Sequence, residues 1–498
     1  MLKVTIISGI LWHRTIRLKE ISVQTKLVID GDRVGGSDGD MIDVLNPATG
    51  EVVATVDGGS TADILAACDA AAAAQKQWAQ TPPRQRAELL RKCYDVMMAN
   101  QSDLADLIVA EHGKPKADAM GEIAYAAEFF RWNSEETVRM HGTVGVNPAG
   151  TARMLVHHVP VGVVLMVTPW NFPAAMITRK VAPALGAGNA TVIKPAKETP
   201  LTALALADLF ENDAGLPKGL LNIVTTKSAS EPVKAAMNHD AVRMVSFTGS
   251  TPVGQTLLRQ AADRVLKVTM ELGGNAPFVV FADADLDLAV QGAIAAKMRH
   301  SAQTCTAANR FIVEASVMDS FSEKLAAAMS AMTVGIGTDA TSEVGPLINQ
   351  DAVGSVDGLV QDAVAAGATV VTGGSPADGP GYFYPPTVLK NVAPAAKVCR
   401  EEIFGPVAPL ISFTGEDEAI ALANDTEMGL MGYVYTQDLG RGLRVSEQIQ
   451  AGMIGLNRGV VSDPAAPFGG MKQSGLGREG ASEGIYEFCE TQYIATNW

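Results

Sequence analysis

Cys305 is the residue of this chain whose setting most favours covalent chemistry. It lies in the polar segment "SAQTCTAAN" (301–309), between a helix-like stretch and a β-branched run, rather than on the apolar face of a helix. His300 precedes it by five residues, but no carboxylate is placed to orient the imidazole, so the Cys–His protease pattern is weak. Backbone amides and a bound cation can activate a thiol instead. Cys305 is therefore a candidate nucleophile, with a buried small hydrophobe and a metal ligand as alternatives.

Two other polar residues follow predicted strands. Asn171 stands in "VTPWNFP" (167–173), a rigid turn that can aim the side-chain amide at a developing oxyanion, although the residue can equally cap the next helix. Glu271 stands in "MELGGNAP" (270–277), where apolar neighbours are expected to raise the pKa of its carboxyl toward a value useful to a general base. The alternative for Glu271 is a surface glutamate beside a turn.

Two further strand ends have the features of a nucleotide site. Lys194 ends the run "ATVIK", where an ammonium group can reach ribose hydroxyls or a phosphate, although a single loop lysine is more commonly solvated. At the second strand end, glycines allow a ligand to approach the backbone closely, and the N-terminus of the following helix offers free amides to a phosphate. No GxGxxG follows a predicted strand, so the usual Rossmann fingerprint is absent. The second strand end, "FTGSTPVG" (247–254), contains Gly249, Ser250, Thr251 and Gly254.

The composition excludes several classes of protein. A net charge of −15 argues against nucleic-acid binding, which requires a basic face. The five cysteines are scattered without CxxC or a histidine cluster, so we predict no metal site and no disulfide framework, and we expect a reducing, cytoplasmic compartment. No apolar run approaches the roughly 18 to 20 residues of a membrane span. Residues 1–26 lack the features of a signal peptide and are expected to be a disordered or loosely attached extension.

Apolar strands that alternate with helices predict an α/β fold. The runs "VGVVLMV", "ATVIK", "LLNIVT" and "AVRMVSF" predict a parallel sheet covered on both faces, and the second half of the chain repeats the alternation. The β-like C-terminus is expected to pair with "TARMLVHHVPV" (151–161), and the open edge of that pair suits an oligomer contact. The predicted division is an extension at 1–26, a dinucleotide-binding domain at 27–146 and 164–273, a catalytic domain at 274–474, and an oligomerisation element at 147–163 and 475–498.

Five motifs in this order resemble the aldehyde dehydrogenase superfamily: "TPWNFP", "FTGSTPVG", "MELGGN", "QTC" and "EIFGP". The resemblance runs from about residue 27 to the end of the chain. Within the superfamily, "PWNFPAAMITRK", "CTAANRF", "REEIFGPVAP", "LANDTEMGL" and "PFGGMKQSGLGREG" are similar to succinate-semialdehyde dehydrogenases. This likeness implies two parallel-sheet α/β domains with a small β element for oligomerisation, a homodimer or homotetramer, and a role in 4-aminobutyrate breakdown.

The resemblance also implies a mechanism. The Cys305 thiolate attacks the aldehyde, and the Asn171 amide together with the Cys305 N–H holds the oxyanion of the thiohemiacetal. Hydride passes to a nicotinamide, and Glu271 activates the water that hydrolyses the resulting thioester. The residues that the motifs assign to the cofactor are Trp170, Lys194, Lys197, Gly249, Ser250, Thr251, Gly254, Glu402 and Phe404, with Glu402 and Phe404 at the nicotinamide ribose and ring.

Arg179, Arg299 and Ser462 match the carboxylate-binding residues of the succinate-semialdehyde dehydrogenases. A guanidinium is well suited to a carboxylate, and an acidic protein must supply such cations locally, although a lone Arg is more often part of a surface ion pair. The chain departs from the family at His300 and at Ser301-Ala302, where an Asn–Gly pair or a similar one is usual. Position 307 is Ala, so no redox switch between neighbouring cysteines is predicted.

Cofactor preference depends on position 197. Relatives that prefer NAD often carry Glu there, which binds the adenosine ribose hydroxyls and repels a 2′-phosphate. This chain has Lys197, so NADP is favoured over NAD, although the adjacent Glu198 can restore part of the discrimination.

Four other functions are open to a chain with these motifs. The nearest is the same chemistry on glutarate semialdehyde or another ω-oxo acid or aldehyde. CoA-acylating relatives characteristically lack a glutamate at the position of Glu271, so its presence favours hydrolysis. A non-catalytic binding or structural relative is disfavoured because Cys305, Asn171 and Glu271 are all retained. A thiol hydrolase without cofactor is disfavoured by the cofactor-side motifs.

Overall fold

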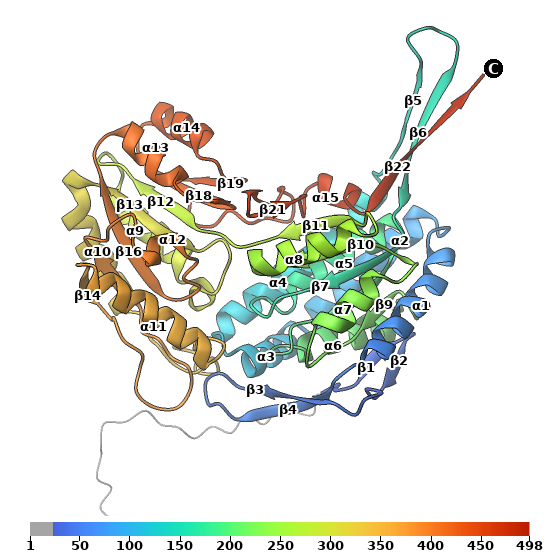
Figure 1. Cartoon of the computed structure of the whole chain (residues 1–498), viewed down its shortest axis with the longest axis horizontal. Helices are drawn as coiled ribbons and strands as arrows, with labels where there is room; N and C mark the ends of the chain where they lie inside the picture. Colours follow the sequence, from blue (N-terminus) through green and yellow to red (C-terminus); the bar gives the residue numbers. More distant parts are fainter. Residues whose placement is uncertain (1–22, 498) are drawn as a thin grey trace, which may run out of the picture.

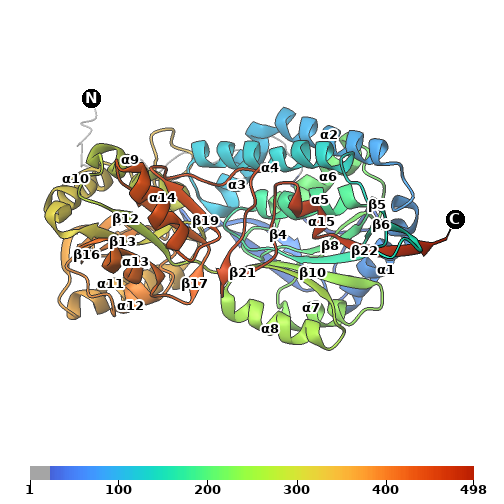
Figure 2. The same cartoon turned by 90° about the horizontal axis from the view of Figure 1, so that it is seen from above.

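The computed structural model describes residues 23–497, in which two α/β units lie side by side and a narrow sheet projects from one of them (Figure 1). The predicted fold of two parallel-sheet α/β units is confirmed. The predicted extension at 1–26 lies outside the described residues except for 23–26. Viewed from above, the segment around β21 (Gly475–Leu476) runs between the two units (Figure 2).

The first unit is built on an eight-stranded sheet in the order β2-β1-β9-β8-β7-β10-β11-β21. The strands from β9 to β11 are parallel, whereas β1 and β21 join antiparallel at either side. Every residue of β7 and β8 is buried, as expected for strands covered on both faces. The strands are β1 (Leu27–Ile29), β2 (Asp32–Val34), β7 (Val163–Val167), β8 (Ala190–Lys194), β9 (Leu221–Ile223), β10 (Val242–Thr248), β11 (Lys267–Glu271) and β21.

Helices pack around this sheet, and a separate hairpin of β3 (Met41–Leu45) and β4 (Val52–Asp57) lies beside it (Figure 1). Cys68 and Cys93 are fully buried and belong to the core of this unit. The helices are α1 (Thr61–Trp78), α2 (Pro83–Ala99), α3 (Gln101–His112), α4 (Lys116–Thr137), α5 (Ala175–Ala187), α6 (Leu201–Asp208) with the π-helical turn η1 (Leu209–Asp213), α7 (Ser230–Met237), α8 (Thr251–Ala262) and α15 (Glu483–Tyr486).

The second unit contains a seven-stranded sheet in the order β14-β15-β16-β13-β12-β18-β19, with only β14 antiparallel to its neighbour. Its strands are β12 (Ala276–Val280), β13 (Ala308–Glu314), β14 (Thr369–Thr372), β15 (Thr387–Lys390), β16 (Val407–Phe413), β18 (Met431–Tyr435) and β19 (Met453–Leu456), and β17 (Met428–Gly429) pairs separately with β20 (Met471–Lys472). Its helices are α9 (Leu286–Lys297), η2 (Arg299–Ala302), η3 (Ala315–Val317), α10 (Met318–Ser330), α11 (Gln350–Ala365), α12 (Lys397–Arg400), α13 (Glu416–Asn424) and α14 (Leu439–Gln448).

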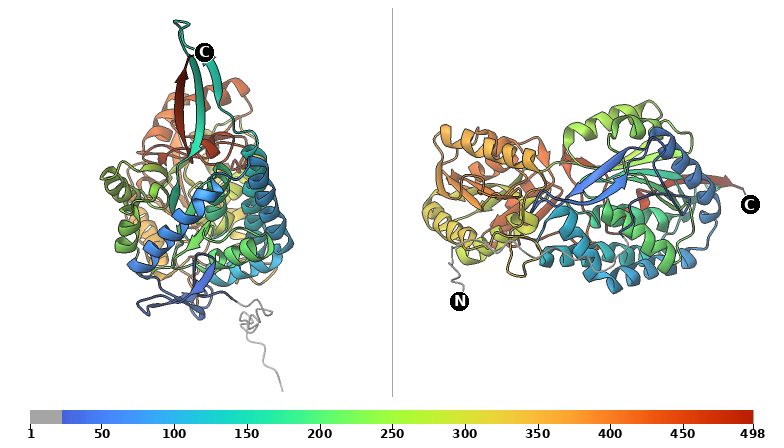
Figure 3. Two further views of the ribbon diagram at one scale, coloured as in Figure 1. Left: turned by 90° about the vertical axis from the view of Figure 1, so that its right-hand side faces the viewer. Right: turned by 90° about the horizontal axis from the view of Figure 1, so that it is seen from below.

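The projecting sheet has the order β22-β6-β5 and stands clear of both units (Figure 3). The C-terminal strand β22 (Cys489–Thr496) pairs antiparallel with β6 (Arg153–Pro160), as predicted for the C-terminus. The sheet also includes β5 (Thr143–Val146), and β21 belongs to the eight-stranded sheet. β5 was assigned by sequence to the dinucleotide-binding domain, and β21 to the oligomerisation element, so both predicted boundaries fall beside a strand that pairs elsewhere. The division into functional domains stays a prediction. Between residues 23 and 497, no helix has the length and apolar character that crossing a membrane would need.

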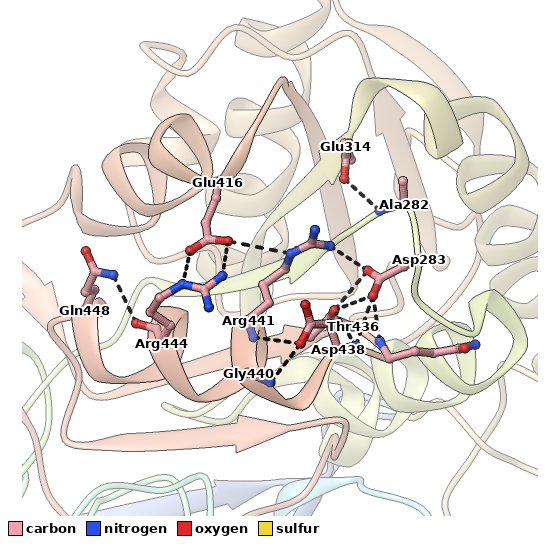
Figure 4. Close-up of polar contacts among 11 residues, drawn as sticks. Ala282, Asp283, Glu314, Glu416, Thr436, Asp438, Gly440, Arg441, Arg444 and Gln448 are labelled. Atoms are coloured by element: carbon pink, nitrogen blue, oxygen red, sulfur yellow. Dashed lines mark hydrogen bonds and ion pairs between the residues drawn. The ribbon is translucent and has the colours of Figure 1, made fainter.

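A polar network ties α14 to the sheet of the second unit (Figure 4). Asp283, just after β12, accepts hydrogen bonds from the Thr436 hydroxyl at 2.8 Å, the Asp438 amide at 3.0 Å and Arg441 Nη1 at 2.9 Å. Glu416 at the start of α13 receives two hydrogen bonds from Arg444, at 2.8 and 2.9 Å. Because these bonds cross between elements distant in sequence, the network should stabilise the outer edge of this unit.

Asp283→Ala is expected to lower the free energy of unfolding by about 1–2 kcal/mol, since it removes the acceptor of several hydrogen bonds. Burial opposes ionisation of Asp283, but the Thr436 hydroxyl, the Asp438 amide and Arg441 together lower the pKa of its carboxyl. Its contribution is therefore fully present above the unfolded aspartate pKa of about 4 and is lost as the pH falls through the lower folded pKa. Urea unfolding at pH 7 and at acidic pH measures the loss of stability. Glu323→Ala, on the exposed face of α10, is the control. Equal midpoints for both variants at pH 7 would contradict the prediction.

Candidate active site

Cys305 lies between η2 and β13, in a segment that is fixed by hydrogen bonds to residues 345 and 348 of the same chain. Three successive residues before it have positive φ: His300 at 54°, Ser301 at 57° and Ala302 at 64°. The Ser301 hydroxyl accepts a hydrogen bond from Gly345 N at 2.8 Å, and Gln303 Oε1 accepts one from Ile348 N at 2.9 Å. These contacts maintain an unusual backbone path, which costs energy for non-glycine residues. The segment thus presents Cys305 in one fixed position.

The Cys305 thiol faces two cavities and is protonated at neutral pH. Burial raises the pKa of the Cys305 thiol to about 12, and the positive charges of Arg179 and Arg299 oppose this rise. Cys305 lines both a cavity of about 280 Å³ and a second one of about 330 Å³. A nucleophilic role therefore needs a proton acceptor or an additional positive charge beside the sulfur. Among the described residues no group of three or more His, Cys, Asp and Glu side chains could hold a metal ion.

Asn171 and Glu271 lie with Cys305 around the larger cavity. Asn171 is 4% exposed, and its Nδ2 donates to Gln303 O at 3.0 Å, which brings the amide to the Cys305 segment. An amide nitrogen carries two hydrogens, so a second one remains for a ligand. Asn171 Oδ1 has no hydrogen-bond partner among the described residues.

Glu271 is the last residue of β11 and is also 4% exposed. Burial, reinforced by the negative charge of Glu479, raises the pKa of its carboxyl well above the usual value, while Arg179 and Lys180 act in the opposite direction. The rise has the direction expected from the apolar neighbours in the sequence. Glu271 Oε2 lacks a hydrogen-bond partner within the described part of the chain, so the oxygen is available to a water molecule or a proton.

The smaller cavity brings together the three residues assigned to the substrate carboxylate. Arg179, Arg299 and Ser462 line it together with the Cys305 sulfur. Arg179 already forms an ion pair with Glu479, and its guanidinium carbon lies 3.9 Å from the centroid of the Phe468 ring. The remaining walls are mostly aromatic or small, and include Gly121, Tyr125, Phe172, Met176, His300 and Phe468. The site is a small pocket with two guanidinium groups, and its wall also contains His300 and the carboxylates Asp118 and Glu122.

The larger cavity has the chemistry of a dinucleotide cleft. Glu402 accepts a hydrogen bond from Gly274 N at 3.2 Å, and burial raises the pKa of its carboxyl to about 7.

 The Phe404 ring packs edge-on against Trp170, with ring centroids 5.5 Å apart. Thr248 Oγ1 has no partner among the described residues, and at the start of α8 the Ser250 side chain makes no capping hydrogen bond to the helix. An orphaned hydroxyl beside an open helix N-terminus fits a phosphate-bearing cofactor.

The other four residues assigned to the cofactor do not line this cavity. Lys194 is buried at the end of β8, and burial lowers the pKa of its ammonium group. Lys197 is exposed in the loop before α6. Thr251 begins α8 and donates to Gln473 O at 3.4 Å. A side chain at Gly254 would meet Leu272 at 2.4 Å, so this glycine lets α8 pack closely on the segment after β11.

The sequence did not reveal several buried charged residues around the site. Glu479, 2% exposed, accepts a hydrogen bond from Lys180 Nζ at 2.5 Å and pairs with Arg179. Lys114 and Glu122 form a second buried pair next to Asn171. A lysine or glutamate in a loop or helix is usually solvated, so nothing in the sequence marked Glu479, Lys180, Lys114 or Glu122 as buried.

Comparison with known proteins agrees with this geometry. The model of the aldehyde dehydrogenase family matches residues 34–494. A succinate-semialdehyde dehydrogenase of Paenarthrobacter nicotinovorans is 56% identical over 443 residues, which cover 89% of this chain and 98% of that protein. A glutarate-semialdehyde dehydrogenase of Pseudomonas aeruginosa is 47% identical over 94% of this chain and 96% of its own length.

A solved structure is similar over its whole length. The crystal structure of an NADP-dependent enzyme of E. coli has a TM-score of 0.94 and 46% sequence identity, and the match covers 96% of this chain and 98% of that one. The fold, the paired cavities around a cysteine and the family match lead to the same conclusion: the chain belongs to the aldehyde dehydrogenase family.

Proposed function

We propose that this enzyme oxidises succinate semialdehyde to succinate with a nicotinamide dinucleotide. The observation that supports this substrate is the cavity of about 280 Å³ in which Arg299, Ser462 and Arg179 lie around the Cys305 sulfur. A short aldehyde with a distal carboxylate suits such a pocket, because a guanidinium binds a carboxylate through charge-assisted hydrogen bonds. The name of the relative that is 56% identical gives independent support.

The chain's own residues account for the first chemical step. The Cys305 sulfur attacks the aldehyde carbon, and the negative charge that develops on the aldehyde oxygen is held by Asn171 Nδ2 and the Cys305 backbone N–H. Such donors act most strongly in a buried site, where they need no reorganisation as the charge develops. Because burial keeps the thiol protonated, its proton must leave to solvent before or during the attack, either directly or through Glu271 on the same cavity.

The second step returns the enzyme to its starting state. A nicotinamide dinucleotide, when bound, supplies the hydride acceptor that converts the thiohemiacetal into a thioester. Trp170, Thr248, Ser250, Glu402 and Phe404 line the cavity that would hold it. Glu271 then takes a proton from a water molecule, whose oxygen attacks the thioester carbon. The Cys305 thiolate leaves and takes up that proton as the carboxylic acid is released.

A second substrate is favoured by a specific feature of the pocket. Gly121 of α4 lines the smaller cavity, and a Cβ at this position would meet no heavy atom within 4 Å. The space beside it leaves room for a longer chain, and glutarate semialdehyde is longer by one methylene group. A relative named for that substrate is 47% identical to this chain. Comparing kcat/KM for the two semialdehydes decides which one the pocket prefers.

Arg299→Gln is expected to lower kcat/KM for succinate semialdehyde about 10- to 100-fold, because a hydrogen bond to a charged group contributes about 1.5–3 kcal/mol. Butanal, which has the same number of carbons but no carboxylate, is the control and should be oxidised equally well by the variant and the wild type. Initial rates of NADPH formation with both aldehydes measure the effect. Equal losses with both substrates would place Arg299 outside carboxylate recognition.

The preference for NADP is proposed from Lys197. Its exposed ammonium group can pair with a 2′-phosphate, and the E. coli structure at 46% identity is that of an NADP-dependent enzyme. Lys197→Glu is expected to lower the NADP-to-NAD ratio of kcat/KM roughly tenfold or more, since a like charge repels the phosphate. Lys397→Glu, on an exposed lysine of α12, makes the same charge change in the other unit and should leave the ratio unaltered. A wild type that strongly prefers NAD would refute the argument.

A homodimer or homotetramer and a cytoplasmic location complete the proposal. The projecting β22-β6-β5 sheet supports an assembly, because β22 is an open edge with exposed Tyr493 and Ile494. The five cysteines are free, which suits a reducing compartment.

A further inference from the structure

Lys114 is a buried lysine that supports the main chain at Asn171. It lies in the turn between α3 and α4, flanked by Gly113 and Pro115, and its side chain is 0% exposed. Lys114 Nζ donates to Asn171 O at 2.7 Å and to Glu122 Oε2 at 2.6 Å. The ammonium group therefore bonds directly to the residue whose amide faces Cys305.

Glu122 fixes the chain on the other side of Asn171. Its Oε1 accepts hydrogen bonds from Ala174 N at 2.9 Å and Ala175 N at 3.3 Å, at the start of α5. Its Oε2 is the oxygen bound to Lys114, and the Glu122 side chain is also 0% exposed. The ion pair thus anchors residues 171 and 174–175, on both sides of the turn that carries the Asn171 side chain.

Lys114 also contacts the wall of the substrate cavity. Its Nζ lies 4.6 Å from the centroid of the Phe172 ring, and Phe172 lines the smaller cavity beside His300. Moving the pair would therefore displace both Asn171 and one face of the pocket.

A buried ion pair needs a reason, because removing two charges from water costs more than their attraction often returns. Here the Asn171 side chain has only one hydrogen bond, from Nδ2 to Gln303 O, and Oδ1 has no partner among the described residues. One bond does not hold an amide to the precision that an oxyanion donor requires. The main chain must supply that precision, and its fixed points are Lys114 and Glu122.

We propose that Lys114 and Glu122 are positioning residues that hold the Asn171 amide at the aldehyde oxygen. The inference rests on the oxyanion role proposed above for Asn171. The proposed effect of the pair on the aldehyde oxygen passes through residues 171–175.

Glu111 provides a matched comparison within the same fold. It is a fully buried carboxylate at the end of α3, and it accepts hydrogen bonds from Leu201 N at 2.7 Å and Thr202 N at 3.0 Å at the start of α6. Glu111 and Glu122 therefore both cap a buried helix start, but the cap made by Glu111 is on a different helix from the one that follows Asn171.

The test is a mutant cycle in the full-length protein, in which variants of the ion pair are compared with the wild type. Lys114→Met/Glu122→Gln removes the bond to Asn171 O without leaving a lone buried charge, and Gln can still accept from the amides of α5. The variants are measured with and without Asn171→Ala, by the rate of NADPH formation in the first turnover and by thermal unfolding. Glu122→Gln alone is the milder variant, and Glu111→Gln is the control for loss of a buried cap.

Loss of roughly 10- to 100-fold in the first-turnover rate is expected for the double variant, with little further loss once Asn171 is Ala, because residues that act as a unit are non-additive. Glu111→Gln should lower the unfolding temperature but keep that rate. An equal loss of rate in the wild-type and the Asn171→Ala backgrounds, or no loss of rate in the double variant, overturns the inference. If Asn171→Ala alone leaves the rate unchanged, the oxyanion role itself fails. Should the double variant not fold, Lys114→Met alone decides, because it removes the bond to Asn171 O: an unchanged rate counts against the proposal.

Discussion

Cys305→Ala is expected to reduce NADPH formation with succinate semialdehyde by roughly 10³-fold or more, since the loss of a covalent nucleophile removes the whole catalytic unit. The fold should survive, because alanine fits wherever a cysteine side chain fits. Cys399→Ala, which changes another buried cysteine in the same unit, is the matched control and should retain activity within about twofold. Initial rates and thermal unfolding of both variants make the comparison. Substantial activity in Cys305→Ala would exclude the thiol mechanism.

The protonation of this thiol gives a second readout of the same prediction. Burial raises the pKa of Cys305 to about 12, so the thiolate fraction of the free enzyme grows with pH throughout the neutral and alkaline range. Alkylation by iodoacetamide at residue 305 should therefore accelerate about tenfold for each pH unit between pH 7 and pH 10. Mass spectrometry follows the modification, with Cys305→Ala as the blank. A plateau near pH 8 would show that the structure holds the thiol in a more ionised state than its burial implies.

Glu271→Gln is expected to slow steady-state turnover about 10²- to 10⁴-fold, the range for loss of a general base. Glutamine is similar in size but cannot take a proton from water, so the thioester should accumulate after one equivalent of NADPH has formed. Rapid mixing with succinate semialdehyde should show this burst followed by a slow phase. Burial raises the pKa of Glu271, so the wild-type steady-state rate should rise with pH as the carboxyl ionises, and the variant should lose that rise.

Added hydroxylamine separates the two roles available to Glu271. It attacks a thioester directly, so it should restore turnover of Glu271→Gln and release a hydroxamic acid. Absence of the burst, with no response to hydroxylamine, would instead assign Glu271 to removal of the thiol proton. Glu111→Gln, another buried glutamate change, should behave like the wild type in both measurements.

The sequence by itself determined the class of fold. Runs such as "VVLMV" of β7 and "ATVIK" of β8 are fully buried because both faces of their parallel sheet are covered, and that burial is encoded in continuous apolar residues. The pairing of β22 with β6 was also predictable, because an isolated terminal strand requires a partner for its backbone hydrogen bonds. Short motifs at strand ends pointed to Asn171, Glu271 and Cys305, since strand ends of parallel sheets are where ligands bind.

Only the tertiary structure decided how these residues are supported. Glu479 comes from a segment far from Arg179 and Lys180 in the chain, yet it pairs with both in the core. Lys114 in a turn and Glu122 within α4 are ordinary charged residues in sequence, and they become buried supports of Asn171 only after α4 packs against α5. Hydrophobic periodicity reports which face of an element is buried, but not which distant charge lies opposite it. That information arises when the units close around Cys305, because the partners of a buried charge are selected by packing.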